Sequence, residues 1–355
     1  MSAAKAPGGW RIRTANEWTA HDPFGKLKPA DASPGNPPHT SGVTLKLRTQ
    51  KNAYVSFRLL VEGRGEYRVG ARANGGLSVD LYKAWYHRIR GKKEWLPDAL
   101  IPVRDDGVFV LPDADNDIPG QSVQEFWVDV FVPPDARTGE AVGAVTVQAG
   151  GTEQEAPFSI EILERMLPDE PCIRMDHNSY GCRWLQPQYP KLFSSTKTPK
   201  SFWNRTIEAL HDYYRLFHEH RGTFHNLGYG HSGAADAIYA PGITGSGRGK
   251  NLAGWELFDR HYGHLLDGSA FRKAAPDMPR PRRPAAPVWG IYTPINPDWP
   301  ASYLWWGEKG YETEFVRCLR QFDAHFIEKG WIHSKVEFFF NHKKRYRWFE
   351  WDGDE

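Results

Sequence analysis

The sequence predicts a multidomain β plus α/β protein. We expect an N-terminal β-sandwich over residues 1–167, followed over residues 168–355 by the first half of a TIM (β/α)8 barrel. Short segments of strand-type sequence recur through the first part, and strands alternate with amphipathic helices in the second. Two prolines within residues 167–171 separate the two patterns, because proline interrupts regular structure.

Six segments of the first domain are apolar or alternate over strand lengths, and turn residues such as Gly, Pro and Asn separate them. They are residues 43–48, 54–61, 77–82, 123–132, 142–148 and 157–163. Many short strands without a long helical pattern are typical of a β-sandwich.

The second domain reads as strand, loop and helix in turn. Its helix from about residue 199 has an apolar face, with Thr198 as the N-cap and Pro199 in the first turn. Further helices are expected near residues 255–267 and 315–326, and the Gly-rich residues 241–254 are expected to form a loop. The four predicted strands are residues 172–177, 222–229, 288–295 and 335–341. Because a closed barrel needs eight strands, four strands predict its first half.

The charge balance and hydropathy exclude several partners. Forty-five Lys and Arg residues against forty-three Asp and Glu give a formal charge of +2, which argues against a dedicated nucleic-acid binder. No apolar run is long enough for a transmembrane helix, so no membrane partner is expected. The first ten residues lack the apolar segment of a signal peptide, which predicts a cytoplasmic protein. A misassigned start codon would hide a signal and leave an extracytoplasmic location open.

Metal-binding and cofactor-binding patterns are not found, so we expect neither a metal nor a cofactor. Cys172, Cys182 and Cys318 match neither a disulfide framework nor a zinc motif. His211 and His218 share a predicted helix but have no obvious third ligand.

Aromatic residues are abundant, with 15 Trp, 15 Tyr and 19 Phe making 14% of the chain. They predict either a large aromatic core or the walls of a sugar cleft, because apolar sugar faces stack on rings while hydroxyl groups need polar neighbours.

Polar and aromatic residues lie at the carboxyl ends of the four predicted strands, where barrel enzymes place their sites. We expect them to bind substrate, with packing or strand capping as the alternative. They are His177, Asn178 and Tyr180 after the first strand, His225 in the second, Asp298 and Trp299 after the third, and Asn341 at the end of the fourth.

Residues 348–355 contain four carboxylates among three aromatic residues. They form either a frayed acidic terminus or a glycosidase acid pair. Glycoside cleavage needs a protonated carboxyl group at the leaving oxygen and a second group that stabilises the oxocarbenium-like centre. Aromatic surroundings would raise the pKa of one carboxyl group by desolvation.

Several segments of the sequence resemble segments of glycoside hydrolase family 123 and of the related proteins that contain domain of unknown function 4091. The strand-turn segment at residues 126–143 and the Leu-Pro at residues 167–168 are similar to the end of the β-sandwich domain of the family. Residues 95–103 resemble a second segment of that domain. Residues 176–181 resemble the end of the first barrel strand of the family. The resemblance covers most of the chain.

The resemblance implies a catalytic pair. In the family an adjacent Asp-Glu pair follows the fourth strand, and the matching residues here are Asp354 and Glu355, separated from that strand by residues 342–351. Asp354 would orient the substrate's acetamido group, which attacks as internal nucleophile, and Glu355 would protonate the leaving oxygen. The implied activity is substrate-assisted, retaining hydrolysis of β-N-acetylhexosaminides, with N-acetylgalactosaminides as the substrate by family analogy. The implied partner is an N-acetylhexosamine-containing glycan.

Two alternatives stay open beside the enzyme. One is a non-catalytic carbohydrate-binding protein that keeps the aromatic cleft. The other is an inactive truncated fragment, whose open half-barrel would favour self-association because its strand edges are unpaired.

Overall fold

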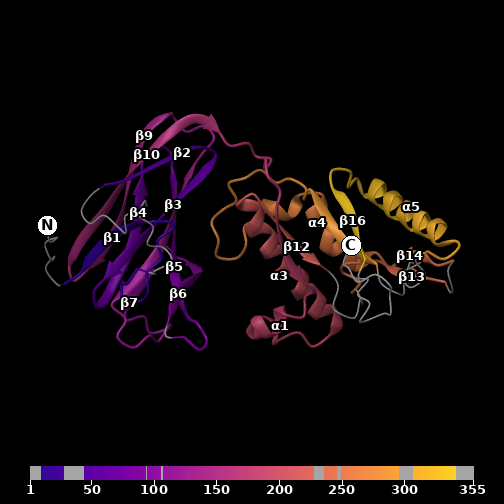
Figure 1. The fold of residues 1–355 in the computed structure, drawn as a ribbon, viewed down its shortest axis with the longest axis horizontal. Helices are drawn as coiled ribbons and strands as arrows, with labels where there is room; N and C mark the ends of the chain where they lie inside the picture. The colour runs from indigo at the N-terminus through magenta and orange to yellow at the C-terminus, as the bar shows by residue number, and fades with distance from the viewer. Residues whose placement is uncertain are drawn as a thin grey trace. The chain divides into compact units, whose positions relative to one another are not determined.

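The computed structural model describes residues 9–27, 44–92, 94–104, 107–227, 236–245, 249–295 and 307–340. The chain divides into two compact units, Met1–Pro168 and Asp169–Glu355 (Figure 1). Strand is the commoner element, with 41% of the described residues in strands and 22% in helices.

One five-stranded antiparallel sheet of the first unit has the order β1-β3-β8-β5-β6. Its strands are β1 (Arg11–Asn16), β3 (Ala53–Glu62), β5 (Ser78–Arg88), β6 (Trp95–Pro102) and β8 (Val123–Val132). The central strand β8 is buried along nearly its whole length, because its two faces meet different coverings. Phe126 and Val128 enter the apolar core, whereas Glu125 belongs to a polar cluster on the other face.

The second five-stranded sheet has the order β2-β10-β9-β4-β7. Its strands are β2 (Leu45–Lys51), β4 (Gly65–Ala73), β7 (Val108–Leu111), β9 (Gly139–Ala149) and β10 (Thr152–Met166). Its ladders are antiparallel except for the parallel pairing of β10 with β2.

The core of the first unit joins residues of both sheets, with Phe57, Phe126, Val145, Phe158 and Ile160 all fully buried. The ring centroids of Phe57 and Phe158 lie 5.3 Å apart. Alternation of side chains along each strand places these residues on the inward face.

Strand β10 leads directly to the second unit and is held beyond its last ladder bond. The Leu167 N–H donates to the Lys51 carbonyl oxygen at 2.9 Å, and the Asn52 side-chain amide donates to the Leu167 carbonyl oxygen at 2.9 Å. The end of β10 is therefore fixed by the turn between β2 and β3.

The second unit combines five α-helices with three two-stranded sheets in its described part. The parallel pairs are β11 (Met175–Tyr180) with β12 (Gly222–Leu227) and β15 (Gly290–Ile295) with β16 (Lys335–Phe340), and the antiparallel pair is β13 (Gly242–Thr244) with β14 (Asn251–Ala253). The helices are α1 (Leu185–Gln188), α2 (Pro190–Phe193), α3 (Pro199–Glu219), α4 (Glu256–Leu266) and α5 (Tyr311–Lys329), with the 3-10 helix η2 at Ser269–Arg272.

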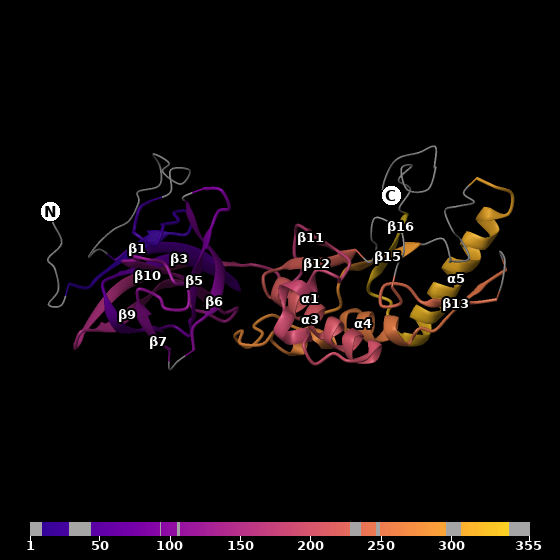
Figure 2. The same cartoon turned by 90° about the horizontal axis from the view of Figure 1, so that it is seen from below.

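Helix α3 begins where the sequence predicts, because Thr198 and Ser201 form a reciprocal capping box and Pro199 stands in the first turn. Helix α3 lies along β12 (Figure 2). Its apolar face packs on that strand, where the Phe224 ring centroid lies 5.2 Å from that of Tyr214 and 5.6 Å from that of Phe217. Helix α5 covers β16 in the same way, with Phe322 and Phe338 at 5.0 Å. Helices thus cover one face of these parallel strands.

The predicted fold class is wrong in its second part, because no (β/α)8 barrel is present among the described residues. A barrel sheet needs each strand paired with the next. Here β12 and β15 share no backbone ladder, and side chains link them instead. His225 Nε2 lies 3.1 Å from the Gly290 carbonyl oxygen, and Trp289 Nε1 donates to Thr223 Oγ1 at 2.9 Å. The expected loop at residues 241–254 also contains the hairpin of β13 and β14.

Among the described helices, none has both the length and the apolar character needed to cross a bilayer.

Candidate functional site

A polar cluster lies on the strand face that the helices leave uncovered. In the register of β11 and β12, Asp176 pairs with Thr223 and Asn178 pairs with His225. Residues paired in a parallel ladder point to the same face, and alternate residues of a strand share a face. The Asp176–Tyr292 hydrogen bond places Tyr292 of β15 on this face as well. We call Asp176, His225 and Tyr292 the Asp176 cluster.

His225 is the buried member of the Asp176 cluster, with 2% of its surface exposed. Its Nε2 faces the Gly290 carbonyl oxygen, which can only accept, so Nε2 carries a proton. Its Nδ1 lies 2.7 Å from Asp176 Oδ1, an ionic contact without the alignment of a hydrogen bond.

Tyr292 contacts the other oxygen of the Asp176 carboxylate. Its hydroxyl group donates to Asp176 Oδ2 at 3.2 Å. Burial, with the nearby charges of Asp176 and Glu337, raises the pKa of Tyr292 to about 12, so the hydroxyl group stays protonated and remains a donor at neutral pH. The Asp176 carboxylate thus accepts a hydrogen bond from Tyr292 on one oxygen and lies against the His225 ring on the other, while its side chain remains 26% exposed.

Aromatic rings enclose the imidazole of His225. The centroid of Tyr292 lies 4.5 Å away at 75°, and that of Trp289 lies 5.2 Å away at 50°. The hydrogen bond from Trp289 to Thr223 fixes the indole, and the Arg174 guanidinium lies over its ring at 5.1 Å. The cluster therefore combines one accessible carboxylate with rigid aromatic surfaces.

The structure places the predicted site residues in different positions. Asn178 is exposed on the same face as the Asp176 cluster, beside His225 in the register. His177 lies on the helix-covered face, where its ring is 4.4 Å from that of Phe217. Tyr180 is the last residue of β11. Outside the described residues are Asp298, Trp299, Asn341, Asp354 and Glu355.

Asp176 and Tyr292 are absent from the residues that the sequence predicts as substrate-binding. The period of two along β11 could have found Asp176, because it precedes Asn178 by two positions. No comparable signal marks Tyr292, whose contact with Asp176 spans 116 positions of the chain.

Within the part of the chain that the structure describes, no group of three or more His, Cys, Asp or Glu side chains is arranged to hold a metal ion.

Comparison with known proteins gives a likeness in fold only. No protein-family model matches the sequence, and no curated protein does. A solved structure from Clostridium perfringens, a family 123 glycoside hydrolase studied for glycolipid glycan hydrolysis, aligns with a TM-score of 0.56 at 10% identity. The alignment covers 92% of this chain, which spans 58% of the length of that enzyme.

Other solved structures align over less than half of the chain. A PapD-like domain of human CEP192 covers 46% of this chain and 94% of its own, at 9% identity and a TM-score of 0.21. The CooA pilin subunit of enterotoxigenic Escherichia coli covers 44% of this chain and 99% of its own, at 9% identity and a TM-score of 0.22. Such scores carry no argument about this chain.

Proposed function

We propose that this chain acts on carbohydrate in the manner of a glycoside hydrolase and that the Asp176 cluster contacts the sugar. The observation that carries the proposal is the Asp176 carboxylate, which accepts a hydrogen bond from Tyr292 and lies against the buried His225 ring while it stays accessible. The fold likeness to a family 123 glycoside hydrolase supports the same class of activity.

The chemistry of the cluster suits a sugar. A fixed carboxylate accepts hydrogen bonds from sugar hydroxyl groups, and its pre-orientation reduces the entropy lost on binding. The rings of Trp289 and Tyr292 supply apolar surface beside it, and Asn178 adds an amide on the same face. Carboxylates next to aromatic rings recur in pockets that bind polar ligands with apolar faces.

The proposed reaction is hydrolysis of a β-linked N-acetylhexosaminide, an N-acetylgalactosaminide in the first instance. Glu355 would donate a proton to the leaving oxygen, and Asp354 would orient the acetamido group, whose oxygen attacks the anomeric carbon. This attack expels the protonated leaving group and closes a cyclic intermediate. Water then attacks the same carbon from the opposite side, so two inversions leave the anomeric configuration retained. The family resemblance supports these roles, and the Asp176 cluster would hold the sugar during the reaction.

A binding and turnover experiment tests the proposal. Calorimetry with N-acetylgalactosamine and hydrolysis of an aryl β-N-acetylgalactosaminide would be measured on the full chain and on Asp176→Asn. Loss of one charge-assisted hydrogen bond predicts at least about tenfold weaker sugar binding. Asp323→Asn is the matched control, because Asp323 is exposed on α5 of the same unit. Equal sugar affinity in all three proteins contradicts the assignment of the Asp176 cluster.

Glu355→Gln separates catalysis from binding. An enzyme loses turnover and keeps sugar affinity, since glutamine cannot donate the proton. Sugar binding without turnover in the unmodified chain would instead assign a non-catalytic carbohydrate-binding protein.

A further inference from the structure

A concave site lies at the start of the parallel strands of the second unit. A cavity of about 400 Å³ is lined by residues at the start of each parallel strand of the second unit. Arg174 immediately precedes β11, Gly222 begins β12, Trp289 immediately precedes β15 and Lys335 begins β16. Asp176, His225 and Tyr292 do not line this cavity, but Trp289 does, and its ring also contacts that of His225, so the cavity adjoins the Asp176 cluster.

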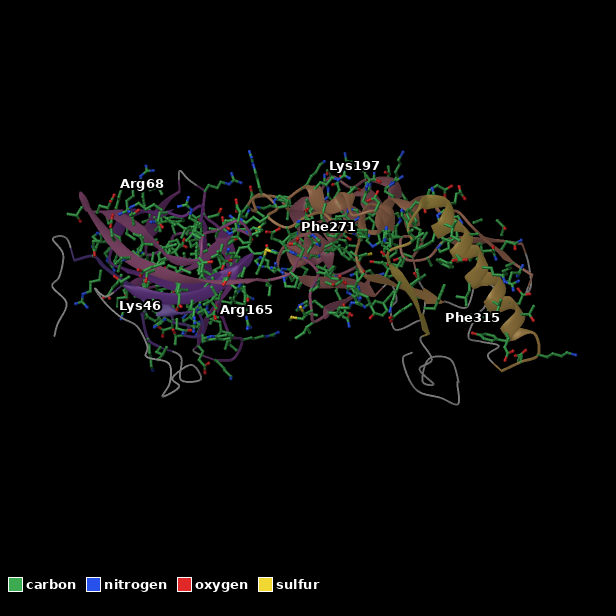
Figure 3. The ribbon with its side chains drawn as sticks, turned by 90° about the horizontal axis from the view of Figure 1, so that it is seen from above. Lys46, Arg68, Arg165, Lys197, Phe271 and Phe315 are labelled. Atoms are coloured by element: carbon green, nitrogen blue, oxygen red, sulfur yellow. The ribbon has the colours of Figure 1, made fainter. Side chains whose placement is uncertain are left out.

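The walls of the cavity are mostly apolar. Aromatic rings from three different segments face it, namely Phe224 of β12, Phe271 of η2 and Trp289 (Phe271 is labelled in Figure 3). His218 of α3 stacks on Phe271 with ring centroids 4.1 Å apart, and its Nε2 lies 3.1 Å from the Pro284 carbonyl oxygen. Burial, together with the charge of Arg283, lowers the pKa of His218 to about 4, so it is neutral near pH 7. Phe271 is thus covered by His218 and is only 2% exposed, and the accessible apolar lining comes from Trp289 with Pro284, Ala286 and Pro287. Such a lining suits a ligand with an apolar body.

The charged lining is predominantly positive. Four cationic residues, Arg174, Arg221, Arg283 and Lys335, face the cavity against two acidic residues, Asp169 and Glu170, which leaves a formal excess of two positive charges. Arg174 and Lys335 are exposed and therefore border its mouth. Among the described residues, no carboxylate lies within ion-pair distance of Arg174 or Lys335, so their charges are available to a ligand.

Arg221 adds a backbone observation. It has a φ of +59° in the turn between α3 and β12, a position where glycine is the usual residue. A left-handed conformation is disfavoured for an L-residue because its Cβ approaches the following carbonyl oxygen. An arginine nevertheless occupies this position on the cavity wall.

We propose that this cavity binds an organic anion with a flat apolar body, an aromatic carboxylate or sulfonate, whose rings lie against Trp289 and whose acidic group meets Arg174 and Lys335 at the mouth. The cavity is within the size range of small-molecule sites. This binding does not depend on the proposed action on carbohydrate.

The test compares two fluorescent probes that share their rings but differ in charge. Anilinonaphthalene sulfonate carries the acidic group, and phenylnaphthylamine lacks it. We expect one sulfonate probe per chain, bound at least about tenfold more tightly than the neutral probe at physiological salt, as a charge-assisted contact predicts. Equal affinity for the two probes, or several sulfonate probes per chain, would overturn the proposal.

Variants locate the site. Arg174→Gln and Lys335→Glu change exposed side chains and should each weaken sulfonate binding by about fivefold or more without affecting the neutral probe. Lys197→Glu is the control, since Lys197 is an exposed lysine of the same unit outside the cavity lining (Figure 3). Ala286→Trp, on the exposed rim, should block both probes. An equal loss in the Lys197 variant, or full binding in the Ala286 variant, contradicts the assignment.

Discussion

Each unit contains a buried histidine in contact with a carboxylate, but the two surroundings differ. In the first unit, Glu125 is 1% exposed, and it accepts from the backbone N–H of the fully buried His21 while pairing with Arg58. In the second unit, Asp176 meets His225 and Tyr292 and stays 26% exposed. A carboxylate with its partners all inside the protein stabilises the fold, whereas one that is held and left accessible can serve a ligand.

The sheets explain this difference. The first unit pairs its described strands in two continuous ladders, and loop residues cover the polar face around Glu125. The second unit joins β12 to β15 through side chains, and the helices that the structure describes cover one face of the strands. Substitution at the two carboxylates should therefore separate stability from binding.

The largest expected effect is on stability in the first unit. Glu125→Gln should lower the free energy of unfolding by about 3 kcal/mol, because it leaves Arg58 beside a neutral group in a nearly closed site. Urea denaturation of the full chain measures it. Glu164→Gln, at an exposed position of β10, serves as control and should change the value by less than about 0.5 kcal/mol. Similar values for the two variants would show that the Glu125 cluster adds little stability.

The next largest expected effect is a loss of stability of the second unit in acid. Burial lowers the pKa of His211 to about 4 and that of the neighbouring His261 well below its usual value. Below pH 6.5 the unfolded chain binds protons that the folded unit does not, so stability present above pH 6.5 is lost as the pH falls towards 4. Between pH 7 and pH 5, His211 alone predicts a loss of about 2 kcal/mol.

His211→Gln tests the cause of that loss. The glutamine amide keeps a donor for the His261 carbonyl oxygen and does not titrate, so the unfolding free energy should depend less on pH in the variant. Parallel pH profiles for the variant and the unmodified chain, from urea denaturation between pH 5 and pH 7, would rule out His211 as the source.

The smallest expected effect on stability is at the exposed carboxylate. Asp176→Asn should change the free energy of unfolding by less than about 1 kcal/mol, because water reaches Asp176 and its contacts are partly screened. The same variant should lose most of its sugar affinity. If Asp176→Asn lost as much stability as Glu125→Gln, the Asp176 carboxylate would stabilise the fold as the Glu125 carboxylate does.

Local patterns in the sequence predict individual elements well. The apolar run at residues 123–132 becomes β8 with the same bounds, and Thr198 caps α3 as its sequence indicates. These elements depend on periodicity and on neighbouring residues, which a sequence displays directly. The parallel pairing of the strands also follows from the alternation of strands and helices.

Contacts between distant segments are what the sequence does not reveal. The link from His225 to Gly290 spans 65 positions and takes the place of a backbone ladder that a strand pattern alone would predict. Nothing local marks Tyr292 as the second partner of Asp176, or Trp289 as a surface shared by His225 and the cavity at the strand starts. Such contacts depend on packing, not on periodicity.

The attachment of β10 also determines how the chain would respond to mechanical force. Tension that enters through Pro168 would load β10 along its length, between a parallel neighbour and an antiparallel one. Both ladders would then have to slide in shear, with all their hydrogen bonds loaded together. The hydrogen bonds that link Leu167 with Lys51 and Asn52 would resist the first movement. A force probe pulling on the connection should therefore find the first unit stiff, because strands loaded in shear cannot open one bond at a time.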